Sequence, residues 1–421
     1  MLWLRPISIF LLAWTAWTIR PVDVRDHKFV LAMAAAIVAV VAISLVPLPP
    51  AVWQSLPGRE VIAQLDQATG SGPVWRPLTM TPSNTLNALY SLALPGALLL
   101  LLAQMDEREI LFLVPVVAAM LGLSVLVGML QAAGLPLDFY QIDNPVAGLF
   151  ANRNHQGLAI ACFLPIVAML ATRDAKNLTR SARRRRDGIL LAVGLAMIPL
   201  IFITGSRAGL VLGGMGLLLA VYLWQSAAHF SLSRPKVLLT LGSVVLLTVG
   251  SIATLLVASD RNLVVQRLIA KDMSNELRIP IWRTTAEIVA QYMPMGSGPG
   301  SFVEVFQIAE KNEDLVPRYV NHAHNDFLEV ALTGGIASIL LISLAFIAFA
   351  ICAWRISRAR DVPRDARRYR WLGLGLIALC AAASVVDYPL RTPALACLFV
   401  FAVFLAGGRR ASEGSPPRAR A

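Results

Sequence analysis

The chain has 421 residues, of which 57% are hydrophobic and only 15% are charged. A soluble globular protein carries about 25% charged residues, so the composition argues against that class and predicts a polytopic helical membrane protein. The net charge of +12 comes from short basic clusters between apolar runs. That distribution is typical of cytoplasmic loops and not of a nucleic-acid-binding surface.

Apolar runs predict about eleven membrane-spanning helices, because a bilayer core takes about 20 apolar residues per helix. The expected spans are residues 7–19, 29–47, 86–104, 110–130, 155–172, 189–204, 208–224, 237–258, 327–352, 371–386 and 392–407. The first run is short, and Trp14 and Trp17 also suit an interfacial or re-entrant helix. The predicted fold is all-α, a transmembrane bundle of about 11–12 spans over residues 1–408 with one large, partly helical loop.

Basic residues predict the orientation of this bundle. The densest lysine and arginine clusters lie in residues 173–188, in residues 354–370 and in the tail 409–421. Alternating spans put all three on one side, which the positive-inside rule identifies as the cytoplasm. The tail is rich in Pro, Arg and Ser, which predicts disorder. The opposite side receives residues 48–85, 131–154, 204–209 and 259–326, of which the last is long enough to be a functional loop.

The cysteines do not indicate a disulfide framework or a zinc site. All four lie inside or at the ends of apolar runs, with no metal-ligand spacing: Cys162, Cys352, Cys380 and Cys397. We expect them to pack as small hydrophobic side chains.

Four arginines are expected at the outer mouth of the bundle: Arg153, Arg207, Arg278 and Arg391. The positive-inside rule places most basic residues on the cytoplasmic side, so arginines on the outer side need another explanation. A guanidinium grips phosphate oxygens in a bidentate fork and stays charged at working pH. Several of them converging at the outer leaflet would suit a lipid diphosphate. The alternative for each is a side chain that reaches to lipid headgroups. Arg207 stands out because it lies in "TGSRAG", a tight turn between two apolar runs.

Two further segments carry polar or glycine-rich patterns. "FANRNHQG" (150–157) precedes an apolar run, and Asn154 is a candidate helix cap. "MGSGPGSF" (295–302) predicts a tight turn that presses the backbone against a neighbour, with a phosphate-binding nest as the weaker alternative.

"NHAHNDFLEV" (321–330) concentrates proton-handling side chains at the start of an apolar run. His322 and His324 alternate, which on a strand would put both on one face. A neutral imidazole at the membrane border can take a proton from a sugar hydroxyl. A metal site with Asp326 and a simple capped helix entrance are the alternatives. Asn325 is expected to cap the next helix.

Glu329 lies one turn into that helix and is a candidate to orient an imidazole. Asp326 places a negative charge near the positive end of the same helix.

These segments resemble the O-antigen ligase and Wzy-type polymerase superfamily. "HAHNDFLEVALTGGI" resembles its signature, and "GLFANRNHQGLAI", "TGSRAGL", "ELRIPIW" and "MGSGPGSF" occur in the family's order, so that the resemblance spans about residues 145–340. The resemblance implies an inverting glycosyltransferase of the bacterial inner membrane that takes glycan from undecaprenyl diphosphate at the periplasmic face. Ligases deliver it to the lipid A core, and polymerases to another lipid-linked repeat. No cofactor, metal or nucleotide sugar is implied.

The same resemblance implies roles for individual residues. His324 matches the catalytic histidine that activates the acceptor hydroxyl, and Arg207 and Arg278 match the arginines that hold the diphosphate. Arg153 is a candidate for the same task. The remaining candidate substrate-binding residues are Asn154, His322, Asn325 and Arg391. A nonbasic residue is usual where this chain has His322, so which imidazole is the base stays open. A transporter of the same lipid and a structural or sensory membrane protein are the alternatives of other classes.

Overall fold

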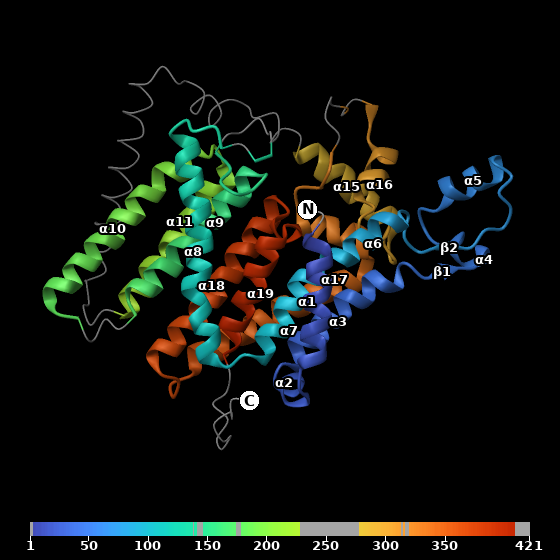
Figure 1. Ribbon diagram of the computed structural model, residues 1–421. Helices are drawn as coiled ribbons and strands as arrows, with labels where there is room; N and C mark the ends of the chain where they lie inside the picture. The colour runs from blue at the N-terminus through green and yellow to red at the C-terminus, as the bar shows by residue number, and fades with distance from the viewer. Residues whose placement is uncertain are drawn as a thin grey trace.

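The computed structural model describes residues 3–137, 139–140, 146–173, 178–227, 278–312, 315 and 320–408 (Figure 1). The helices in these residues are α1 (Leu4–Thr18), α2 (Pro21–Asp26), α3 (Lys28–Ile43), α4 (Pro50–Trp53), α5 (Glu60–Ala68), α6 (Pro82–Ser91), α7 (Ala93–Gln104), α8 (Glu107–Ala132), α9 (Arg153–Ala171), α10 (Arg180–Ile203), α11 (Arg207–Ala227), α15 (Arg278–Tyr292), α16 (Phe302–Ala309), α17 (Asp326–Arg358), α18 (Arg364–Val386), η3 (Pro389–Arg391) and α19 (Pro393–Gly407). The strands are β1 (Pro47–Leu48) and β2 (Arg76–Pro77).

The helices confirm the predicted class of all-α polytopic protein. Among the described residues, seven helices are long and apolar enough to cross a membrane: α6 with α7, α8, α9, α10, α11, α17 and α18. α3 and α19 are shorter apolar helices. Every expected span coincides with a helix except 237–258, which lies outside the described residues together with the tail 409–421. α1 has 15 residues, so the first apolar run is too short for a straight span.

α9 forms the centre of the bundle, and most of its side chains are buried. It packs against α11 with the two backbones in contact, because a Cβ at Gly157 would lie 2.7 Å from the Cα of Gly209. Cys162 of α9 and Cys380 of α18 are buried in the same hydrophobic cluster. All four cysteines are free thiols; Cys162 and Cys380 are buried, and Cys352 and Cys397 are partly buried.

One end of the bundle is tied together by Arg368, near the start of α18. Its buried guanidinium donates to Thr172 at the end of α9, to the carbonyl of Leu223 in the last turns of α11 at 2.9 Å, and to Ser226 at 3.2 Å. The basic residues that begin α10 and those between α17 and α18 therefore lie at this same end. The starts of α9 and α11 and the end of α18 meet at the opposite end.

α17 is broken near its start by Gly335, whose φ is 58° and ψ is −151°. The segment after α15 lies against the break and bonds to its freed backbone groups. Ser297 N–H donates to the Leu332 carbonyl at 3.0 Å, and Gly298 N–H donates to the Thr333 carbonyl at 2.9 Å. "MGSGPGSF" is thus a tight turn pressed against α17, as its glycines predicted. Two of its amides are used by helix carbonyls, which leaves them unavailable for a phosphate nest.

Residues 44–80 form a small lobe at the side of the bundle (Figure 1). β1 pairs antiparallel with β2, and the Trp53 indole N–H donates to the Val74 carbonyl at 2.9 Å. Arg59 attaches the lobe to the turn after α15, because its guanidinium donates to the Gly296 carbonyl at 3.0 Å and lies over the Tyr292 ring.

Candidate active site

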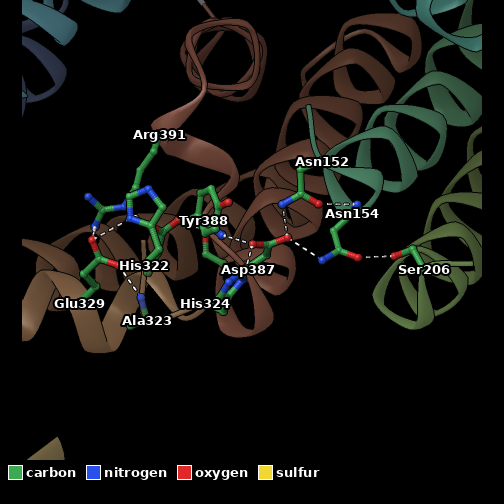
Figure 2. A network of polar contacts seen from close by, with 12 residues as sticks. Asn152, Asn154, Ser206, His322, Ala323, His324, Glu329, Asp387, Tyr388 and Arg391 are labelled. Carbon is green, nitrogen blue, oxygen red and sulfur yellow. Dashed lines mark hydrogen bonds and ion pairs between the residues drawn. The ribbon is translucent and has the colours of Figure 1, made fainter. Parts of the chain in front are cut away.

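Asp387 is the centre of a polar network at the end of α18 (Figure 2). Its carboxylate accepts from Asn152 Nδ2 at 3.0 Å, Asn154 Nδ2 at 2.6 Å and Tyr388 N–H at 3.0 Å. His324 Nδ1 lies 3.2 Å from Oδ1 of the same carboxylate. The network therefore joins the start of α9 and the turn before α17 to the end of α18.

The environment of Asp387 keeps it ionised. Burial by itself raises the pKa of this carboxyl, but the hydrogen bond with His324 and the charge of His155 lower it to about 2. A carboxylate can only accept, so we assign the proton on His324 to Nδ1. His324 Nε2 then carries the lone pair, which is the arrangement of a general base oriented by a carboxylate.

His322 forms a second imidazole–carboxylate pair, with Glu329 as its partner. Its Nδ1 lies 3.1 Å from Glu329 Oε1, which also contacts Arg391 Nη2 at 3.2 Å. Arg391 Nε donates to Asp326 at 3.0 Å. Glu329 thus orients His322, while His324 takes Asp387. Arg391 has two carboxylate partners within the protein, and its role in substrate binding stays a prediction.

Tyr388 lies between the two pairs (Figure 2). Its ring centroid is 4.1 Å from that of His322, 5.2 Å from His324 and 5.3 Å from His155. Burial, with the nearby Asp387 charge, raises the pKa of the Tyr388 hydroxyl. The phenol is therefore neutral, and both imidazoles lie close to its ring. Both histidines face this ring, although the stretch forms a loop and no strand.

Asn325 caps α17, as predicted, because its side chain accepts from the Leu328 N–H at 3.1 Å. Asn154 lies in the first turn of α9, and the cap of that helix is Asn152. Asn154 instead bridges two helices: its Nδ2 donates to Asp387, and its Oδ1 accepts from Ser206 Oγ at 2.6 Å.

Arg153 and Arg207 are the first residues of α9 and α11, and Arg278 is the first described residue of α15. The first two helices start side by side, and Arg153 Nη1 lies 3.6 Å from the position that a Cβ of Gly205 would take. Arg207 is exposed. Positive helix ends and two arginines therefore gather around the turn that leads into α11, next to the Asp387 network.

Asp387, Tyr388 and Asn152 were missed by the sequence analysis. The signal for Asp387 was present, because "DYPLR" places a carboxylate directly after an apolar run, where ionisable residues are costly. The partner of this carboxylate, His324, is 63 residues away in the chain. No local sequence pattern identifies the two residues as a pair.

Within the described part of the chain, no three His, Cys, Asp or Glu side chains are grouped to hold a metal ion. Metal-independent chemistry stays a prediction.

A family model matches part of the chain. Residues 192–343 match the family model described as O-antigen ligase, a range that includes Arg207, Arg278, His322, His324 and Glu329. A comparison with curated proteins found no match. Residues 192–343, about a third of the chain, are therefore similar to the O-antigen ligase family.

Proposed function

We propose that the protein is a glycosyltransferase that moves glycan from undecaprenyl diphosphate to a hydroxyl of the lipid A core, with inversion and without a metal. The observation that carries the proposal is the His324–Asp387 pair, at 3.2 Å, beside the arginine-bearing starts of α9 and α11. The match of residues 192–343 to the O-antigen ligase family supports a lipid-linked glycan donor and a glycan acceptor in general.

The residues support a single displacement. The acceptor oxygen attacks the anomeric carbon while His324 Nε2 takes the hydroxyl proton, so that the new C–O bond forms as the bond to the diphosphate oxygen breaks. Attack from the face opposite the leaving group inverts the anomeric centre. Asp387 stabilises the imidazolium that results, and the proton then passes to water.

The leaving group is a diphosphate, which develops negative charge as the bond breaks. Arg153, Arg207 and Arg278 would hold its oxygens in bidentate contacts. The positive ends of α9 and α11 would add to this stabilisation. Charge neutralisation by arginine supplies what a divalent cation supplies in many phosphate sites.

The reaction is proposed at the periplasmic face of the bacterial inner membrane. The basic clusters around Arg368 mark the opposite end of the bundle, and the positive-inside rule assigns that end to the cytoplasm. The site at the other end would then meet donor and acceptor in the outer leaflet.

The test is transfer by the purified full chain in vesicles that contain undecaprenyl-diphosphate glycan and lipid A core. We expect glycan on lipid A core with the wild-type chain and none with His324→Gln. Longer lipid-linked glycan made from donor alone would identify a polymerase instead. Movement of intact donor across the bilayer without any new glycosidic bond would indicate a transporter and overturn the proposal.

A further inference from the structure

The peptide group between Ala323 and His324, in the loop before α17, is hydrogen-bonded by a side chain from another helix. The Trp282 indole N–H, on α15, donates to the Ala323 carbonyl at 2.9 Å. The Ala323 N–H donates to Glu329 Oε2 at 2.8 Å. The methyl of Ala323 is fully buried in a cluster that includes Ile281 and Leu332. Two successive peptide planes and the side chain between them are therefore fixed.

His324 needs this support because of its backbone conformation. Its φ is 50°, and it is the non-glycine residue with positive φ in the described part of the chain. Such a backbone conformation is strained for a residue with a side chain and persists where its surroundings hold it. The carbonyl that Trp282 holds belongs to the peptide plane from which the φ of His324 is measured. Fixing that plane fixes the direction in which the imidazole leaves the backbone.

Trp282 also connects this turn to an arginine of the proposed diphosphate site. It lies four residues after Arg278 in "ELRIPIW", which puts the two side chains on one face of α15. The arginine and the hydrogen bond to the histidine turn are thus carried by the same helical segment.

We propose that Trp282 is a positioning residue for the transfer reaction. Its indole N–H holds the Ala323–His324 peptide plane, so that His324 keeps its contact with Asp387 while α15 presents Arg278. This inference rests on the proposed function, since it assigns Trp282 to the base of that reaction.

The experiment compares Trp282→Phe with Trp53→Phe in the vesicle assay. Both changes delete an indole N–H that donates to a backbone carbonyl at 2.9 Å, and Trp53 lies in the lobe of residues 44–80. For Trp282→Phe we expect kcat to fall about 10- to 100-fold with an unchanged KM for the lipid donor, because a misplaced base slows the chemical step. Trp53→Phe should leave kcat near the wild-type value.

A third variant separates the hydrogen bond from packing. Trp282→His keeps a ring N–H, on Nε2, at the place of the indole Nε1–H, but removes the larger ring. It should recover part of the kcat that the Phe variant loses. Amide exchange in the segment 320–329 should be faster in Trp282→Phe and unchanged in Trp53→Phe.

Several outcomes would overturn the inference. A kcat for Trp282→Phe equal to that of Trp53→Phe would do so, as would a rise in KM alone. A His variant as slow as, or slower than, the Phe variant would assign Trp282 a packing role, and so would loss of the fold in both. Absence of transfer by the wild-type chain would instead contradict the proposed function. In that case, unchanged amide exchange of segment 320–329 in Trp282→Phe would separately contradict the positioning role.

Discussion

The two imidazole–carboxylate pairs around Tyr388 have different partners. The carboxylate of Asp387 receives neutral amides and the His324 imidazole, so its charge is available to stabilise a protonated His324. The Glu329 carboxylate is shared between His322 and the cationic Arg391. The more effective base is the imidazole whose carboxylate is not already paired with a cation.

Replacing each histidine by glutamine tests this distinction. We expect His324→Gln to lower the transfer rate by at least about 100-fold, the contribution of a general base. His322→Gln should lower it far less, because the Glu329 carboxylate that His322 contacts is already paired with Arg391. The measurement is the single-turnover rate with saturating lipid donor. Equal losses in the two variants, or a larger loss at His322, would contradict the assignment.

Asp387→Asn should lower both the transfer rate and the free energy of unfolding. The loss of unfolding free energy should depend on pH. The pKa of Asp387 falls from 3.8 to about 2 on folding. Its contribution to stability, about 2 kcal/mol from the shift, is therefore complete above pH 3.8 and is lost as the pH falls toward 2. Unfolding of wild type and Asp387→Asn in detergent should differ at pH 6 and converge near pH 2. A difference that persists unchanged at pH 2 would contradict this origin.

At the scale of single elements, α17 is two helical segments joined at Gly335. The first segment carries Asp326 and Glu329 of the site, and the turn after α15 holds it through bonds to the Leu332 and Thr333 carbonyls. The site is therefore built on a short segment outside the long apolar part of the helix. The hydropathy of residues 327–352 predicted a single helix, because a glycine inside an apolar run is compatible with a straight helix as well as with a break.

Gly335→Ala should destabilise the protein. Its φ of 58° disfavours a Cβ, which would also collide with the backbone of Pro294 and Met295. We expect a loss of about 1–3 kcal/mol, measured as a lower midpoint of thermal unfolding. Gly214→Ala in α11 is the matched control, since nothing lies within 4 Å of its added methyl. An equal midpoint in the two variants would contradict the role of Gly335.

At the scale of the whole molecule, the densest basic clusters and the polar network around Asp387 occupy opposite ends of the bundle. Arg368 joins the ends of α9 and α11 to the start of α18, and Asp387 joins their starts to its end. If the end with the basic clusters faces the cytoplasm, as the positive-inside rule predicts, the proposed site faces the other side of the membrane.

Cysteine labelling in bacterial cells tests that orientation. Ser71 in the side lobe and Ser181 at the start of α10 are both exposed. Ser71→Cys should react with a membrane-impermeant maleimide in cells whose outer membrane has been opened. Ser181→Cys should react only after the inner membrane is permeabilised, with the wild-type chain as background. The reverse pattern would place the site in the cytoplasm and contradict the proposed reaction.

The amino-acid sequence alone determined the class of protein and most helix positions, because these depend on local properties: apolar runs of bilayer length and charge clusters. The resemblance to the O-antigen ligase and Wzy-type polymerase superfamily supplied the candidates His324, Arg207 and Arg278. The tertiary structure decided the pairings. Asp387 reaches His324 across 63 residues, Glu329 takes His322, and the turn after α15 breaks α17 at Gly335. Each of these contacts depends on which helix ends pack together, and the packing of helix ends cannot be read from the hydropathy of a single chain.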